Sequence, residues 1–184
     1  NWIARESVEF LRGRDPNRPY LMITSFPHPH SPFDPPAPYD TMYDLADAQL
    51  PGETLEFNAG LAPSARELMM NRKGFGFCAV EDIGEAKQRR MATYIRALIR
   101  QIDDAVGEIL AQVDLSNTVV FFTTDHGDYY SRRGVMLKTP GIPFEDIART
   151  PFFCSGAGVP AGRRVGHVVQ NTDFALTCLE LAGL

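Results

Sequence analysis

A long amphipathic segment followed directly by an apolar run is the feature that most constrains the fold of this chain. Between residues 85 and 113, apolar residues recur three, four or seven positions apart with charges between them, which is the pattern of a helix with one buried face. Residues 116–125, SNTVVFFTTD, are continuously apolar and β-branched at their centre, as in a strand buried on both faces. A helix and a buried strand in succession predict a layered α/β domain.

Other segments extend this pattern along the chain. Residues 2–12 predict a short surface helix, residues 19–26 (PYLMITSF) and 150–156 (TPFFCSG) predict two more buried strands, and residues 171–183 predict a closing amphipathic helix. We therefore expect a layered mixed β-sheet flanked by helices. Residues 27–84 are rich in proline, glycine and short polar residues, and connections of that length are usually functional, so we expect substrate contacts there.

Composition limits the kinds of partner that we expect. The chain has 184 residues, of which 44% are hydrophobic, and a net charge of −5, as in one globular domain with a sizeable core. Its basic pairs are short and scattered, so we expect no nucleic-acid partner. No apolar run reaches the roughly 20 residues that span a bilayer, and the sequence shows no signal peptide. We expect no membrane partner, and localisation and oligomeric state stay open.

The first candidate site lies at the end of the predicted strand 116–125. Asp125, His126 and Gly127 follow that strand at its carboxyl end, where ligands gather in open α/β sheets. Gly127 permits a turn that would let both preceding side chains aim at one point. A carboxylate oxygen and an imidazole nitrogen together suit a divalent cation. Alternatively, Asp125 caps the following loop and His126 is a half-buried structural histidine.

The second candidate site is a proline-rich loop after the predicted strand 19–26. Its three prolines limit the entropy lost in holding His28 and His30 in place. A preorganised histidine beside an anionic substrate can donate a hydrogen bond or transfer a proton. The same spacing also fits an H-x-H metal site or an exposed loop, and the three interpretations stay open.

A lone lysine is the third candidate. Lys138 lies in GVMLKTPGIPFED, a loop that returns toward the predicted strand 150–156. A lysine that reaches a site holding a tetrahedral oxyanion would neutralise charge and could protonate a leaving oxygen. The alternative is a solvated surface lysine.

Five blocks of the sequence, taken in order, resemble the sulfatases of the alkaline-phosphatase superfamily. The blocks are SFPHPHSPF, IRALIRQIDDAVGEIL, VVFFTTDHGD, LKTPGIPFEDIARTPF and NTDFALTCLELAGL. The similarity is greatest to arylsulfatases and phosphonate monoester hydrolases, covers nearly the whole chain and is weakest between Pro35 and Gly84. It implies an alkaline-phosphatase-like α/β fold and metal-dependent hydrolysis of small-molecule or glycan sulfate esters.

The resemblance also implies roles for individual residues. Asp125 matches the family's late metal-ligand aspartate, and His126 matches the neighbouring position that completes the ligation. The metal that this implies is calcium, with manganese, magnesium and zinc as alternatives. His30, in the pattern P-H-x-P-F, and Lys138 match the histidine and the lysine that contact the sulfate or the leaving-group oxygen.

Two departures from the family pattern involve candidate substrate contacts. His28 stands where many relatives have an acid, and the turn that contains Arg132 and Arg133 stands where they often have G-x-H-G. We expect substrate contacts at His28 and Arg133, with a solvated basic turn as the alternative for the arginines.

The family's nucleophile is absent from these residues. It is a cysteine converted to formylglycine, and none of Cys78, Cys154 and Cys178 lies in a C-x-P-S-R or C-x-A-x-R context. We therefore expect residues 1–184 to be a partial catalytic domain, inactive alone, with formylglycine and two further aspartates upstream and a smaller subdomain downstream. The alternatives are a phosphodiester or phosphonate monoester hydrolase and a catalytically dead remnant.

Overall fold

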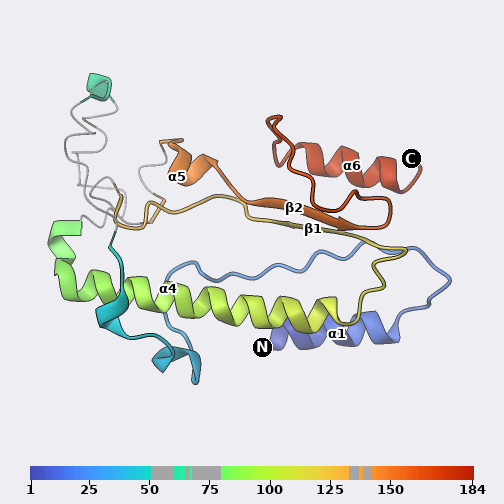
Figure 1. Ribbon diagram of the computed structural model, residues 1–184, viewed down its shortest axis with the longest axis horizontal. Helices are drawn as coiled ribbons and strands as arrows, with labels where there is room; N and C mark the ends of the chain where they lie inside the picture. Colours follow the sequence, from blue (N-terminus) through green and yellow to red (C-terminus); the bar gives the residue numbers. More distant parts are fainter. Residues whose placement is uncertain (51–59, 65–66, 68–79, 133–136, 139–141) are drawn as a thin grey trace. The chain divides into compact units, whose positions relative to one another are not determined.

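The chain divides into two compact units. The computed structural model describes residues 1–50, 60–64, 67, 80–132, 137–138 and 142–184 (Figure 1). One unit combines residues 1–114 with 127–149, and the other combines residues 115–126 with 150–184. Each unit is described separately below.

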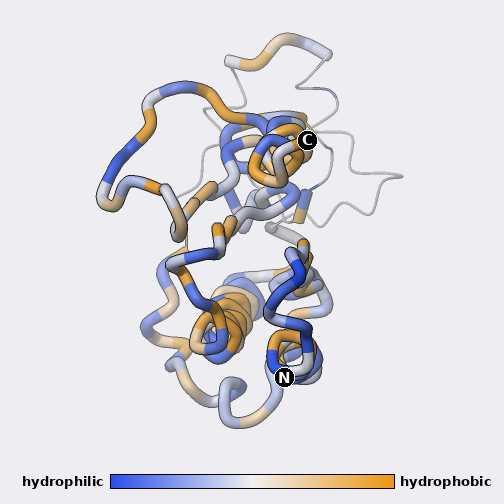
Figure 2. Tube along the Cα trace, turned by 90° about the vertical axis from the view of Figure 1, so that its right-hand side faces the viewer, coloured by the Kyte–Doolittle hydropathy of each residue, from blue (hydrophilic) through white to orange (hydrophobic). Residues whose placement is uncertain are grey.

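Two helices form the frame of the first unit. Helix α1 spans Trp2–Gly13, and the side chain of Asn1 caps its amino terminus. Helix α4 spans Val80–Leu110, with a break in helical geometry at Gly84, where φ is 70°. The two helices contact one another and lie side by side where Figure 2 shows them nearly end-on. Both predicted helices are therefore confirmed: after the break at Gly84, α4 follows the pattern predicted over 85–113 and ends at Leu110.

Residues 19–26 form no strand, so the prediction of a buried strand there is wrong. Tyr20, Met22 and Phe26 pack against the α1–α4 core, while Leu21 and Ile23 on the other side of the backbone are 67% and 74% exposed. The core itself comprises Ala4, Leu11, Ala105 and Ile109. The segment is extended, but it pairs with no strand among the described residues, and a strand is defined by its hydrogen-bonded neighbour.

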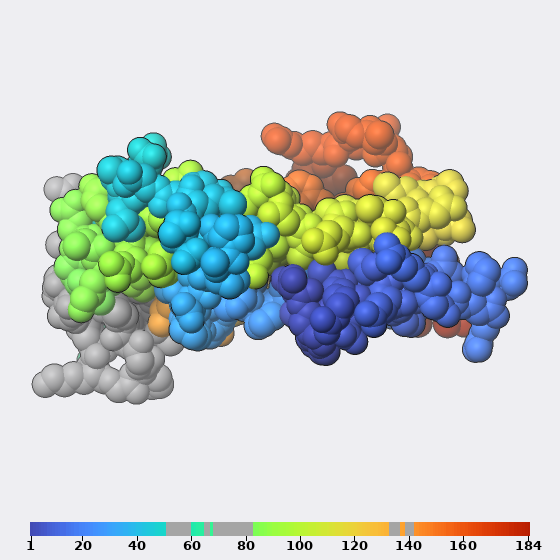
Figure 3. All heavy atoms as spheres, turned by 90° about the horizontal axis from the view of Figure 1, so that it is seen from below, coloured from blue at the N-terminus to red at the C-terminus, as the bar shows by residue number. Residues whose placement is uncertain are grey.

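Two short 3-10 helices pack on α4. Helix η1 spans Tyr39–Thr41 and helix η2 spans Leu45–Asp47, and both contact α4. On the face shown in Figure 3, η1 and η2 lie over the green part of α4, and α1 lies along its yellow carboxyl-terminal part. The Tyr39 hydroxyl donates to Asp104 at 2.9 Å, and Arg100 Nη2 lies 2.7 Å from the same carboxylate. The hydrogen bond from Tyr39, reinforced by Arg100, lowers the pKa of Asp104.

The second unit contains a two-stranded antiparallel sheet. Strands β1, Val119–Thr123, and β2, Phe152–Gly156, confirm the strands predicted at 116–125 and 150–156. Helix α6, Asp173–Leu181, lies next to the strands in Figure 1. It packs on the sheet through aromatic rings of Phe121 and Phe174, whose centroids are 5.2 Å apart. The predicted α/β class is confirmed, and no described helix has the length and apolar character needed to cross a membrane.

Candidate active site

The structure brings His30 and Lys138 together, although they lie 108 residues apart in sequence. Lys138 Nζ is 3.3 Å from His30 Nε2. The other ring nitrogen of His30, Nδ1, is 2.7 Å from the carbonyl oxygen of Ser31. A carbonyl oxygen can only accept, so this contact is a hydrogen bond when Nδ1 carries a proton, and in that tautomer Nε2 can accept from the lysine ammonium. Both ring nitrogens of His30 therefore have a polar partner in this structure.

Backbone and side-chain bonds from one tyrosine hold the loop that carries Lys138. Tyr129 is fully buried. Its backbone N–H donates to the carbonyl oxygen of Leu137 at 3.0 Å, and its hydroxyl donates to the carbonyl oxygen of Ile142 at 2.7 Å. One residue therefore fixes the position immediately before Lys138 and a second position after it. The sequence analysis did not identify Tyr129, since an aromatic residue after a strand end carries no signal of its own burial.

Apolar packing and an ion pair support the same loop. The residues packed on Tyr129 are Leu61, Ile142, Phe144 and Ile147. Arg132 Nη1 lies 3.2 Å from Asp146 Oδ1, and the Asp146 side chain is only 6% exposed. Asp146 belongs to the short helix α5, Glu145–Ala148. The loop also holds Tyr130 and Leu137 at φ values of 50° and 64°, which non-glycine residues adopt only when their surroundings impose them.

In the second unit, the carboxylate of Asp125 and the ring of His126 converge at the end of β1. The backbone N–H of His126 donates to Asp125 Oδ1 at 2.9 Å, and Asp125 Oδ2 lies 3.5 Å from His126 Nε2. The Asn171 amide donates to the carbonyl oxygens of Thr124 and Asp125, at 3.2 and 3.4 Å, and thereby holds the backbone at this point. The Asp125 side chain is 85% exposed and therefore accessible to a cation.

Position 127 requires glycine for a reason other than the turn that the sequence predicted. Gly127 does not lie in the left-handed region of φ. Its backbone N–H instead donates to the carbonyl oxygen of Ile147 at 2.8 Å. An added Cβ would lie 2.0 Å from the carbonyl oxygen of Asp146. Only a residue without a side chain allows this close approach to α5.

The donor set fits part of a metal site. Asp125 offers an anionic oxygen and His126 an imidazole nitrogen, which are ligands for a divalent cation. Within the described residues, no three histidine, cysteine, aspartate or glutamate side chains gather in one place, so these two residues would need further ligands. His28 is half-buried, and its Nδ1 atom has no hydrogen-bond partner among the described residues. Arg133, the other predicted substrate contact, lies outside the described residues.

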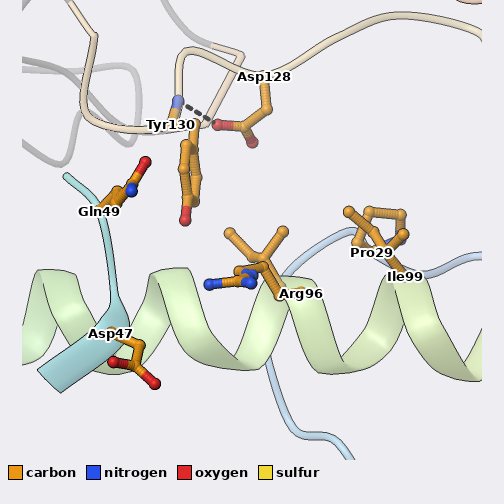
Figure 4. Close-up of a pocket in the computed structure, with 8 residues that line it drawn as sticks. Pro29, Asp47, Gln49, Arg96, Ile99, Asp128 and Tyr130 are labelled. Atoms are coloured by element: carbon orange, nitrogen blue, oxygen red, sulfur yellow. Dashed lines mark hydrogen bonds between the residues drawn. The ribbon is translucent and has the colours of Figure 1, made fainter. Parts of the chain in front are cut away.

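A cleft of about 600 Å³ lies in the first unit beside the histidine loop (Figure 4). Pro29, the residue between the two histidines, forms part of its wall. The other lining residues are Asp47, Gln49, Ile95, Arg96, Ile99, Asp128 and Tyr130. Burial raises the pKa of the Tyr130 phenol, so this hydroxyl stays protonated and able to donate. The sequence analysis expected substrate contacts in residues 27–84, and three of the lining residues come from that segment.

The class of protein follows from comparison with known families. The chain belongs to the sulfatase family, because the sequence model of that family, described as "Sulfatase", matches residues 2–184. Its α/β fold is accordingly alkaline-phosphatase-like.

Individual relatives agree with this family. An arylsulfatase of Clostridium perfringens is 33% identical over 99% of the chain, and the multifunctional alkaline phosphatase superfamily protein PehA of Trinickia caryophylli is 32% identical over 99%. A choline-sulfatase of Rhizobium meliloti is 28% identical over 91%. The chain spans 38%, 37% and 32% of the lengths of these three proteins.

Proposed function

We propose that the protein hydrolyses sulfate esters of small molecules or glycans, and that Lys138 and His30 act on the oxygen that leaves. The 3.3 Å contact between Lys138 Nζ and His30 Nε2 is the observation that carries this proposal. Sulfatase family membership and the similarity to an arylsulfatase support it. We further propose that residues 1–184 are part of a longer catalytic domain that supplies the formylglycine nucleophile.

The lysine–histidine pair suits a leaving oxygen that gains negative charge as the S–O bond breaks. The Lys138 ammonium already donates to His30 Nε2, and a developing oxyanion is a stronger acceptor than a neutral imidazole nitrogen. Lys138 can therefore transfer its hydrogen bond to the leaving oxygen and stabilise the charge there. His30, fixed by its bond to the Ser31 carbonyl oxygen, holds the ammonium in place before the substrate arrives.

Asp125 and His126 would hold a divalent metal, for which we propose calcium, with manganese, magnesium or zinc as alternatives. The support is the convergence of their side chains at the end of β1 and the anionic oxygen that Asp125 exposes. When bound, such an ion polarises an ester oxygen and neutralises charge on the sulfate group. Asn171, by holding the backbone at Thr124 and Asp125, keeps the carboxylate in position for this role.

The leaving-group role is tested by comparing two sulfate esters in the intact enzyme. Lys138→Ala and His30→Ala should lower kcat by about 10² to 10⁴ for an alkyl sulfate, whose alkoxide is a poor leaving group. The loss should be much smaller for 4-nitrophenyl sulfate, because nitrophenolate leaves without help. Lys87→Ala, an exposed lysine on α4, is the matched control. Equal losses for both esters, or losses in KM alone, would remove the pair from this role.

The metal role is tested by titration and chelation. Asp125→Ala should weaken calcium binding in calorimetry and lower turnover, and calcium should restore activity to the chelated native enzyme. If Asp125→Ala binds calcium as tightly as the native enzyme does, Asp125 is not a ligand.

One relative favours a second candidate function. PehA is named a multifunctional alkaline phosphatase superfamily protein, so phosphonate monoester or phosphodiester hydrolysis is the alternative that we propose to test. Turnover of 4-nitrophenyl sulfate and of 4-nitrophenyl phenylphosphonate should be compared in the same preparation. A higher kcat/KM for the phosphonate would replace sulfate hydrolysis as the main activity.

A further inference from the structure

The cleft in the first unit is lined by residues other than the proposed lysine–histidine pair. Among the described residues that form its wall, neither His30 nor Lys138 occurs. Its volume of about 600 Å³ lies in the range of small-molecule sites, roughly 300–1,000 Å³. The cleft can therefore take a ligand of its own, and the groups around it decide the chemistry of that ligand.

The phenol of Tyr130 lies between groups of opposite charge. Burial is the largest influence on its pKa and raises it, while the positive charge of Arg96 lowers this pKa and the negative charge of Asp128 raises it. Both charges therefore act on the same hydroxyl. In Figure 4 this hydroxyl points toward the side of the cleft where the Arg96 guanidinium lies. No hydrogen bond within the described residues contributes to its pKa, so the hydroxyl is available to a ligand.

A second contact holds each charged group in place. Arg96 Cζ lies over the ring of Tyr43, 4.8 Å from its centroid. Asp128 Oδ1 accepts from the backbone N–H of Tyr130 at 2.7 Å. A guanidinium presents planar N–H donors that match a carboxylate, and a carboxylate accepts from an ammonium group. The lining of the cleft thus offers a partner for each sign of charge.

The remaining wall is apolar. Pro29, Ile95 and Ile99 supply this surface, and Ile99 is 51% exposed although it is a large hydrophobic residue. An aliphatic group that covers these side chains would remove apolar area from water, which favours binding.

The charges select against a ligand that carries only one sign. A simple anion would be attracted by Arg96 but repelled by Asp47 and Asp128, and a simple cation would be repelled by Arg96. A purely apolar ligand would take the charged side chains out of water without pairing them, which is costly. A zwitterion with both charges close together can pair with both signs at once.

We propose that this cleft binds a free α-amino acid with an aliphatic side chain. Its carboxylate accepts from Arg96 and from the Tyr130 hydroxyl, its ammonium group donates to Asp128, and its side chain covers Ile95 and Ile99. A peptide is a poorer match, because its two terminal charges are separated by the chain. The proposal does not depend on the proposed ester hydrolysis, since binding is measured directly.

The test is saturation-transfer NMR on the full chain with three ligands that share one branched alkyl group. L-Leucine carries both charges, 3-methylbutylamine lacks the carboxylate, and 4-methylpentanoate lacks the ammonium group. We expect L-leucine to bind about 10-fold or more tightly than either analogue, because each analogue leaves a charged side chain of the cleft unpaired.

Four variants assign this binding to the cleft. Arg96→Met should reduce the affinity for L-leucine to that for 3-methylbutylamine, and Asp128→Asn should reduce it to that for 4-methylpentanoate. Ile99→Ser should weaken the binding of all three ligands. Arg90→Met is the matched control, because Arg90 is exposed on the same helix and does not line the cleft, and it should change none of the affinities.

The ligand series on the native protein keeps the proposal falsifiable even if a variant fails to fold. No signal from L-leucine at about 10 mM would overturn it. Equal affinity for L-leucine and for either analogue would also overturn it, because the site would then recognise a single charge. If Arg96→Met folds and keeps the native affinity, L-leucine binds elsewhere and the proposal fails.

These outcomes are separate from those of the proposed function. Hydrolysis of sulfate esters without L-leucine binding overturns the amino-acid site alone. L-Leucine binding that Arg96→Met abolishes, in a protein that hydrolyses no sulfate ester, supports the amino-acid site while the proposed function fails.

Discussion

Replacing Tyr129 by phenylalanine tests whether one buried hydroxyl holds the loop that carries Lys138. The side chain is fully buried, and its hydroxyl donates to the Ile142 carbonyl oxygen at 2.7 Å. Phenylalanine keeps the apolar ring and its edge-to-face packing on Phe144, and the Ile142 carbonyl oxygen keeps its bond from the Phe144 backbone N–H at 2.8 Å but loses the one from the hydroxyl. Because the acceptor keeps one donor, the loss is that of a single intramolecular hydrogen bond, about 0.5–1.5 kcal/mol. We expect the free energy of unfolding to fall by this amount.

The measurement is urea denaturation together with thermal unfolding. A loss of about 1 kcal/mol corresponds to a fall of roughly 2–4 °C in Tm for a domain of this size. Tyr20→Phe is the matched control, because it removes a hydroxyl for which no hydrogen bond is recorded within the described residues, and it should change the free energy of unfolding by less than about 0.5 kcal/mol. If Tyr129→Phe were as stable as Tyr20→Phe, the reasoning from the buried hydrogen bond would be refuted.

The same substitution has a consequence for turnover. Without the hydroxyl bond to Ile142, the loop loses one of the bonds that hold it, so we expect the position of Lys138 relative to His30 to loosen. Displacements of about 1 Å in a catalytic group cost up to about 10² in rate. We expect kcat for an alkyl sulfate to fall while KM changes little, and the loss should be absent when Lys138 is already alanine. A full additional loss in the double variant would show that Tyr129 acts on stability alone.

Two further substitutions test the packing and the electrostatics of the first unit. Gly127→Ala should lower the free energy of unfolding by about 1–3 kcal/mol, because the new Cβ meets the Asp146 carbonyl oxygen. Gly107 lies inside α4 with open space around it, so Gly107→Ala should instead raise the free energy of unfolding by about 0.5–1 kcal/mol. Equal effects at both positions would contradict the packing argument. Asp104 has a lowered pKa, so its stabilising contribution is present above the ordinary carboxyl pKa of about 4 and disappears as pH falls through the lower folded value. Asp104→Asn should therefore be less stable than the native protein at neutral pH, with the difference shrinking in acid, whereas the exposed Asp103→Asn should show little difference at any pH.

Periodicity predicted the helices and two strands well, because those signals are local. The apolar spacing along α4 and the apolar runs of β1 and β2 are properties of contiguous residues. Residues 19–26 carry the same signal as β1 but form no strand, since a strand also needs a neighbour to accept and donate its backbone hydrogen bonds. The pattern therefore predicts an extended and partly buried segment, which is correct for Tyr20 and Met22. It does not predict whether that segment pairs with another strand.

The composition of the candidate site followed from motifs, but its assembly did not. His30 and Lys138 were each plausible only with a partner, and the proline-rich spacing left a metal site open for His30. What the structure adds is the arrangement of partners: the Ser31 carbonyl oxygen lies at Nδ1 and the lysine ammonium lies at Nε2. That contact depends on Tyr129, whose two bonds fix the returning loop and whose burial no local pattern reveals. A site made of residues 108 positions apart thus depends on a buried residue that takes no part in the chemistry, which is why Tyr129→Phe tests the assembly of the site and Lys138→Ala tests its chemistry.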